Sequence, residues 1–245
     1  MNKIPVTIIT VCRNNAQGLE RTIRSVESQT WQKKEYLVID GASTDETLTV
    51  IKSHEASMTR WVSEPDNGIY DAMNKGVRMA HGTWIIFMNA GDTFASADTL
   101  ERVFGNPQEA DVIYGDVIKE ECGMWNVECG RIKKAEAPRN SHRMFFCHQS
   151  AFVRRSCLTE FPFDTNHRMS ADFKQIKQLY LSGKSFLQLD FPVAVFDTQG
   201  VSNTSRSAGL YDNILVIRET DTLAEQLRLL QRLYFTYLLC KLRGK

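Results

Sequence analysis

The chain has 245 residues, of which 42% are hydrophobic and 24% charged, and its formal net charge is +1 at pH 7. This composition suits one large globular domain, and the near-neutral charge gives no indication of nucleic acid as a partner. No apolar run approaches the ~20 residues that span a bilayer, no secretory signal is recognisable, and the six cysteines lack CxxC or metal-ligand spacing. We therefore expect a cytoplasmic protein with reduced thiols, in preference to zinc or disulfides.

The first part of the chain alternates between strand-like and helix-like segments. Four apolar runs are typical of buried strands: residues 6–11, 36–39, 60–62 and 84–88. Of the helices between them, the first carries Leu19, Ile23 and Val26 at helical spacing, and the second follows a capping box of Ser43 and Glu46. The third places four apolar side chains on one face: Ile69, Met73, Val77 and Ala80. This order predicts an α/β fold with a Rossmann-like, mostly parallel central sheet flanked by helices.

The second half of the chain is less regular. Short strands are predicted at 112–114 and 117–118, a helix at 171–181 and strand material at 186–196, with an irregular and partly basic stretch at 120–146. No linker or low-complexity segment interrupts the chain. We therefore expect one domain over residues 1–206, composed of two halves at 1–105 and 106–206, followed by an amphipathic helical extension at 207–245.

The C-terminal tail carries apolar residues three or four apart, which lie on one face of a helix: Leu223, Leu227, Leu230, Tyr234 and Leu238. Basic residues accompany them: Arg228, Arg232, Lys241, Arg243 and Lys245. Three alternatives stay open for this face. It packs on the domain, it packs on a second copy of the chain in a homodimer, or it lies on an anionic membrane surface at the inner face of the cytoplasmic membrane.

Polar side chains gather where the predicted strands end. Thr10, Cys12 and Arg13 close the first strand, Asp40 closes the second, and residues 89–92 (NAGD) follow the fourth. In open α/β sheets, ligands bind outside the carboxyl ends of the strands. Neither a GxGxxG turn nor a GxxxxGK[ST] loop is present, which argues against a Rossmann-type dinucleotide cofactor and a P-loop.

Two acids are candidates for chemistry. Asp92 in NAGD is placed to bind a hard divalent cation such as Mg²⁺ or Mn²⁺, which takes one or two carboxylates together with substrate phosphate oxygens. The alternative is an ordinary Asn/Gly/Asp turn. Asp172, at the start of the predicted helix, is a candidate general base for an attacking hydroxyl. Its alternative is an acid favoured by the helix dipole.

The motifs together resemble those of one family. They occur in this order: VTIITVCRNNAQGLERTIRSVESQT, VIDGASTDET, SEPDNGIYDAMNKGVRMAHGTWIIFMNAGD, YGD, CHQSAFVRRS, FDTNHRMSADF and TQGVS. Over roughly residues 4–205 the chain resembles the family 2 glycosyltransferases, which have the GT-A fold. It is most similar to bacterial enzymes of colanic-acid, exopolysaccharide or O-antigen assembly, of the WcaE-like kind.

The resemblance implies an inverting hexosyl transfer from a nucleotide-sugar, by default UDP-linked, to a hydroxyl of a glycan or lipid-linked acceptor. It makes residues 1–105 the nucleotide-binding half and residues 106–206 the acceptor-side half. It implies donor contacts for Thr10, Cys12, Arg13, Asp40, Asn74, Asn89 and Gly91. Gly68 and Gly76 match family glycines that allow close backbone approach. Asn89 and Gly91 stand where the family's DxD-type motif often has carboxylates, so the metal role falls to Asp92. The base is Asp172, and His148 and Gln149 lie on the acceptor side, with a purely structural role as their alternative.

Two rival functions remain. A sugar nucleotidyltransferase would normally carry a Gly- and Arg/Lys-rich phosphate loop after the first strand, and CRNNAQG fits this poorly. A non-catalytic nucleotide-sugar-binding or scaffold subunit of a polysaccharide assembly complex is compatible with the thinned DxD motif. The presence of Asp172 favours the enzyme.

Overall fold

The computed structural model describes residues 5–119, 131–198 and 206–242. The strands are β1 (Val6–Cys12), β2 (Lys34–Asp40), β3 (Arg60–Ser63), β4 (Trp84–Phe87), β5 (Thr93–Phe94), β6 (Val112–Lys119), β7 (Arg131–Lys133), β8 (Ala151–Arg154) and β9 (Phe186–Phe196). The helices are α1 (Ala16–Glu27), α2 (Thr47–Ser53), α3 (Ile69–Met79), α4 (Thr99–Phe104), α5 (Arg155–Glu160), α6 (Ala171–Leu181), α7 (Arg206–Thr220) and α8 (Leu223–Leu242), with short 3₁₀ turns η1 (Glu55–Ser57) and η3 (His148–Ser150).

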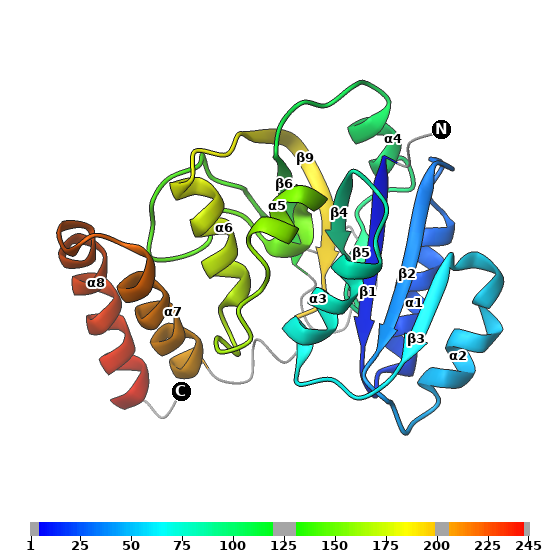
Figure 1. Ribbon diagram of the computed structural model, residues 1–245, viewed down its shortest axis with the longest axis horizontal. Helices are drawn as coiled ribbons and strands as arrows, with labels where there is room; N and C mark the ends of the chain where they lie inside the picture. Colours follow the sequence, from blue (N-terminus) through cyan, green and yellow to red (C-terminus); the bar gives the residue numbers. More distant parts are fainter. Residues whose placement is uncertain (1–4, 120–130, 199–205, 243–245) are drawn as a thin grey trace.

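One sheet runs through the molecule in the order β3-β2-β1-β4-β8-β6-β9-β5, and β7 pairs with β6 (Figure 1). The strands of the first half, β3, β2, β1 and β4, are all parallel. β8 lies antiparallel to both β4 and β6, whereas β6 and β9 are parallel. The predicted α/β fold with a central sheet is confirmed. The two strands predicted at 112–114 and 117–118 are one strand, β6, whose pairing with β9 is irregular between Tyr114 and Val117.

The strands β1, β2 and β4 are buried on both faces, as their continuous apolar runs predict. Because side chains alternate along a strand, Ile9 and Leu37 join one core cluster with Val77 of α3, whereas Ile8 joins the cluster on the opposite face with Leu19 of α1. Helices therefore cover both faces of the sheet (Figure 1).

Two local expectations are wrong. Ser43 does not cap α2, which begins after Glu46 without a side-chain cap. Its hydroxyl instead donates to the carboxylate of Asp40. Gly76 is buried, and a Cβ there would meet Ile9 Cγ2 at 2.6 Å, so its lack of a side chain allows α3 to approach β1. The close backbone approach expected at a ligand serves helix–sheet packing at this position.

The C-terminal extension is two packed helices, α7 and α8, with α7 between α8 and α6 (Figure 1). The buried residues of α8 are Leu229, Leu233 and Cys240, and the first two share a core cluster with Phe173 of α6. Of the face predicted from the apolar spacing, Leu230 and Tyr234 pack against this cluster, whereas Leu223, Leu227 and Leu238 are exposed. Packing on the domain is therefore confirmed for one edge of that face only. Among the described residues, no helix is both long and apolar enough to cross a membrane.

Candidate active site

The residues that end β1 differ in what they offer a ligand. Thr10 is fully buried, with its hydroxyl 3.1 Å from the hydroxyl of Tyr36. Cys12 is 7% exposed, and burial raises the pKa of its thiol far above the usual value. Arg13, by contrast, is exposed at the carboxyl end of the strand. Of the three predicted donor contacts, Arg13 therefore has the side chain with the freest access to a ligand.

Asp40, at the end of β2, has no exposed surface. Its carboxylate accepts hydrogen bonds from the backbone N–H of Ser43 at 3.0 Å and from the hydroxyl of Ser63 at 2.6 Å, besides that of Ser43. The hydroxyl of Ser43 in turn accepts the backbone N–H of Asn14 at 2.7 Å. Asp40 thus ties the loops after β1 and β2 to the end of β3. Its predicted contact with the nucleotide stays a prediction.

Asp66 is a candidate that sequence reasoning missed, because residues 66–68 had the pattern of a turn. A Cβ at Gly41 would clash with the Asp66 carboxylate and would lie 3.3 Å from Cδ of Arg13. The half-buried Asp66 carboxylate therefore lies over the backbone at the end of β2, beside the exposed Arg13. It adds an acceptor to the edge on which the nucleotide was expected.

Asn74 has a structural partner. Its side-chain amide donates to the carbonyl of Phe163 at 2.8 Å and accepts the backbone N–H of Phe163 at 3.0 Å. This pair of bonds fastens α3 to the segment that leads to α6. One N–H and one lone pair of the amide remain for a ligand, so a nucleotide contact by Asn74 stays a prediction.

Asp172 lies in the first turn of α6 and meets Tyr70 of α3 across the site. The Tyr70 hydroxyl donates to Asp172 Oδ1 at 3.0 Å, and the backbone N–H of Phe173 donates to the same oxygen at 2.8 Å. Burial, and then the negative charge of Asp172, raise the pKa of Tyr70, so its hydroxyl keeps its proton and stays a donor. Tyr70 is separated from Asp172 by 102 positions, which is why sequence reasoning missed it.

The segment around η3 contains the predicted acceptor-side residues His148 and Gln149. Burial raises the pKa of the Cys147 thiol to about 11; Lys133 opposes this, and both Asp92 and Asp172 add to it. His148 is 6% exposed and stacks on Phe87, and burial lowers its pKa against the opposing charge of Asp172. The side-chain oxygen of Gln149 accepts from Cys147 Sγ at 3.0 Å.

Asp92 is 3% exposed, and its Oδ1 accepts the backbone N–H of Asp197 at 2.9 Å. Burial, together with the charge of Asp197, raises the pKa of Asp92 to about 7. Gly91 has a φ of +112°, and a Cβ there would meet Asp197 Oδ2 at 2.6 Å, so the Asp197 carboxylate occupies the space that a side chain at position 91 would enter. Arg21 bonds both the Gly91 carbonyl and Asp197.

Three side chains with oxygen donors belong to this part of the structure: Asp92, Asp197 and Asn89. Oδ1 of Asn89 is buried and accepts no hydrogen bond within the described part of the chain, whereas Asp197 is already paired with Arg21 at 3.0 Å. Mg²⁺ and Mn²⁺ prefer such oxygen ligands. Sequence reasoning missed Asp197, since nothing in the sequence signals that it approaches Gly91. Of the predicted TQGVS segment, only Thr198 belongs to the described residues.

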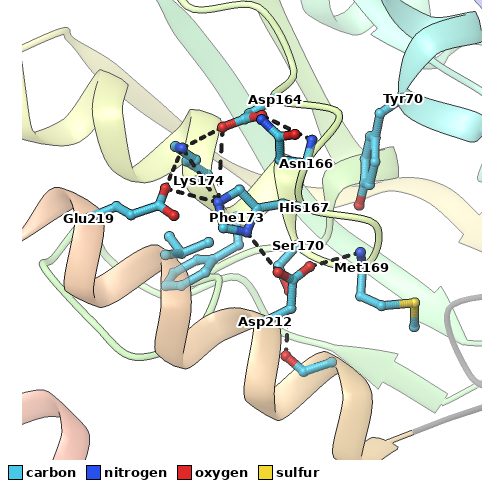
Figure 2. A network of polar contacts seen from close by, with 12 residues as sticks. Tyr70, Asp164, Asn166, His167, Met169, Ser170, Phe173, Lys174, Asp212 and Glu219 are labelled. Atoms are coloured by element: carbon cyan, nitrogen blue, oxygen red, sulfur yellow. Dashed lines mark hydrogen bonds and ion pairs between the residues drawn. The ribbon is translucent and has the colours of Figure 1, made fainter.

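A charged network fastens α7 to the loop that precedes Asp172 (Figure 2). His167, 2% exposed, contacts Asp212 Oδ1 through Nδ1 at 2.7 Å and Glu219 Oε2 through Nε2 at 3.0 Å. Lys174 Nζ donates to Asp164 at 2.6 Å and to Glu219 at 2.5 Å. The ligand atoms of Asp164, His167 and Glu219 lie within 4.8 Å of one another, but the Lys174 ammonium already supplies the positive charge there. The cluster is therefore an ion-pair network.

We expect His167→Gln to destabilise the protein in a pH-dependent way. Burial lowers the pKa of His167, but its bonds to Glu219 and Asp212 outweigh burial and raise the pKa overall. Because the pKa of His167 is higher in the folded than in the unfolded state, its full contribution to stability is present below the pKa of the unfolded state. That contribution is lost as the pH rises through the pKa of the folded state. The gap between the denaturation midpoints of wild type and variant should be widest at acid pH and should narrow on the alkaline side. A constant gap across the pH series would contradict the charged state of His167, and His54→Gln serves as the control.

Comparison with known proteins places this geometry in a family. The family model described as Glycosyl transferase family 2 matches residues 7–160, more than half of the chain. The PGL/p-HBAD biosynthesis glycosyltransferase of Mycobacterium tuberculosis is 34% identical over 174 residues, which are 68% of this chain and 66% of that relative. The chain belongs to glycosyl transferase family 2. Asp172 lies beyond the residues that the family model matches.

Solved structures share the fold. TarS from S. aureus in complex with UDP-GlcNAc has a TM-score of 0.70 at 15% identity, over 91% of this chain and 71% of that one. The mannosyltransferase PcManGT from Pyrobaculum calidifontis, in complex with GDP-Man and Mn²⁺, has a TM-score of 0.63 at 19% identity, over 93% and 65%. The fold is the GT-A fold that the sequence motifs implied.

Proposed function

We propose that the protein transfers a hexose, with inversion, from a nucleotide-sugar to a hydroxyl of a glycan or lipid-linked acceptor. By default the donor is UDP-linked, and the reaction serves bacterial surface polysaccharide assembly of the colanic-acid or exopolysaccharide kind on the cytoplasmic side of the membrane. One observation carries the proposal: in a chain that belongs to glycosyl transferase family 2, the carboxylate of Asp172 accepts the Tyr70 hydroxyl through Oδ1 at 3.0 Å, and among the described residues Oδ2 is left for an acceptor hydroxyl.

The donor half of the site consists of the strand ends. Arg13 is the exposed cation suited to the diphosphate, and Asp40 and Asp66 shape the edge for the nucleoside. Asp92, Asp197 and Asn89 are the residues that would hold Mg²⁺ or Mn²⁺. When bound, such a cation offsets the negative charge that develops on the departing diphosphate.

The acceptor half is organised around Asp172. Among the described residues, both hydrogen bonds that its carboxylate accepts end on Oδ1, which leaves Oδ2 to accept the proton of the attacking hydroxyl. Tyr70 fixes the carboxylate by donating to Oδ1. His148 and Gln149, in the segment around η3, contact the acceptor. Orienting the acceptor hydroxyl against the anomeric carbon contributes much of the acceleration, as positioning does in other transfer reactions.

A second candidate is a non-catalytic nucleotide-sugar-binding subunit. The observation that favours it is the absence of carboxylates at Asn89 and Gly91. Asp197 offsets this absence, because its carboxylate reaches the space above Gly91.

Thermal-shift measurements against UDP-, GDP- and dTDP-sugars, each with and without Mn²⁺, test the donor class. We expect one nucleotide series to raise the melting temperature, and the rise to be larger with Mn²⁺, since a ligand that binds only the folded state stabilises it. No shift with any nucleotide-sugar in either condition would contradict the proposed function.

A further inference from the structure

Helix α8 presents an apolar stripe to the outside of the molecule. Its exposed side chains are Leu223 (79%), Leu227 (70%), Phe235 (65%), Leu238 (55%) and Leu239 (37%). The opposite side of the helix, with Leu229 and Leu233, is buried against α7. The helix therefore has two apolar sides, and its own domain covers one of them. Contiguous exposed apolar surface of this kind marks an interaction site more often than isolated exposed residues do.

The charge on α8 is mainly basic. Residues 223–245 contain five basic residues and one acidic residue, Glu225, which is paired with Arg228 at 2.5 Å. Arg228 lies seven residues before Phe235, and Arg232 lies seven residues before Leu239. Seven residues are about two helical turns, so each arginine lies on the same side of α8 as the apolar stripe. Arg228, Arg232 and Lys241 are all exposed. The surface that α8 offers is both apolar and cationic.

The position of α8 leaves this surface accessible. In Figure 1, α8 is the outermost helix at the end of the molecule away from β3, with α7 on its inner side. Its C-terminal end lies on the lower side of that view, the side to which the carboxyl ends of β1 and β2 point.

We propose that α8 docks the protein on an anionic phospholipid surface, with its axis in the plane of the interface. The stripe enters the boundary between headgroups and acyl chains, and Arg232 and Lys241 pair with lipid phosphates. A second copy of the chain fits this surface less well. A symmetric contact through the same face would bring Arg232 and Lys241 of both copies close together, and Glu225, the acid of α8, is already paired with Arg228. The proposal does not depend on the reaction that the protein catalyses.

Vesicle flotation with the full chain tests the proposal. The two vesicle types are phosphatidylcholine alone and an equimolar mixture of phosphatidylcholine and phosphatidylglycerol. We expect the wild type to float with the anionic vesicles, to stay unbound with phosphatidylcholine alone, and to be released by salt. Leu227→Glu combined with Phe235→Glu should lower the partition coefficient about tenfold or more, since both side chains lose their apolar burial. The combined change Arg232→Gln and Lys241→Gln should lower it to a similar degree.

The control is Leu181→Glu, at an exposed leucine of α6 that is 45% accessible and outside the stripe. It should leave flotation unchanged. All these positions are exposed, so each variant should keep the wild-type melting temperature, which is checked first. Three results would overturn the proposal: no flotation of the wild type with anionic vesicles, an equal loss in the Leu181→Glu control, or a stable dimer in sedimentation equilibrium that Leu227→Glu and Phe235→Glu dissociate while vesicle binding is absent.

Discussion

Asp172→Asn is expected to lower the rate of sugar transfer by about 10²–10⁴-fold, the usual contribution of a general base, while nucleotide binding is retained. An amide at this position keeps the shape of the carboxylate, and its oxygen still accepts from Tyr70 and from the backbone of Phe173. What it loses is basicity, because an amide cannot take a proton from the acceptor hydroxyl. The measurement is a transfer assay with purified variant protein, accompanied by a nucleotide-binding titration.

Tyr70→Phe is the matched control for that experiment. It removes the donor to Oδ1 but leaves the carboxylate, so the loss of transfer should be smaller than with Asp172→Asn. Near-normal transfer by Asp172→Asn would show that the base is another residue. Loss of transfer together with loss of nucleotide binding would show that Asp172 supports the donor site and not the proton transfer.

Lys177→Met is expected to cost about 3–5 kcal/mol of stability, because it leaves a buried carboxylate without its partner. Lys177 Nζ lies 2.9 Å from Asp221 Oδ2, with the two side chains 2% and 0% exposed, and it also donates to the carbonyl of Ser141. Burial lowers the pKa of Lys177 and the bond to Asp221 opposes that. The pair joins α6 to the turn between α7 and α8. Urea denaturation, with the midpoint and slope both fitted, measures the effect.

Two comparisons make the stability result specific. Lys177→Met combined with Asp221→Leu removes both charges and should recover most of the loss, since an apolar pair can replace a buried ion pair. Arg24→Met breaks the exposed pair between Arg24 and Glu20, 2.6 Å apart, and should leave the midpoint unchanged. A midpoint for Lys177→Met equal to that of wild type would mean that water or another group compensates the Asp221 charge.

The sequence predicted the parts of the fold that depend on local pattern. The strands β1, β2 and β4 are continuous apolar runs because both faces are buried, and the spacing of Leu19, Ile23 and Val26 matches the buried side of α1. The two strands predicted where β6 runs unbroken show the limit of this reasoning. A glycine inside a predicted strand, here Gly115, suggests that the strand is interrupted. In the structure β6 continues through Gly115, and a Cβ at this position would meet the carbonyl oxygen of Phe191 in β9 at 2.6 Å.

Sequence motifs suggested some of the candidate site residues, and tertiary contacts add others that no motif names. Asp172 and Asp92 came from motifs at the start of a helix and the end of a strand. Tyr70 and Asp197 gain their place only when α3 meets α6 and when β9 ends beside Gly91. The partner of the apolar face of α8 stayed open at the sequence level for a related reason. Both sides of that helix are apolar, and periodicity does not say which side packs, whereas the structure buries Leu229 and Leu233.

We propose that this chain breaks the bond between a sugar and a nucleoside diphosphate. The direct measurement is nucleoside diphosphate release by the wild-type protein from each of the UDP-, GDP- and dTDP-sugars with Mn²⁺, first without acceptor and then with a lipid-linked glycan acceptor. The account predicts slow release from one nucleotide series, accelerated when acceptor is added. A protein that binds a nucleotide-sugar yet releases no nucleoside diphosphate in either condition would contradict the account and would be a binding subunit.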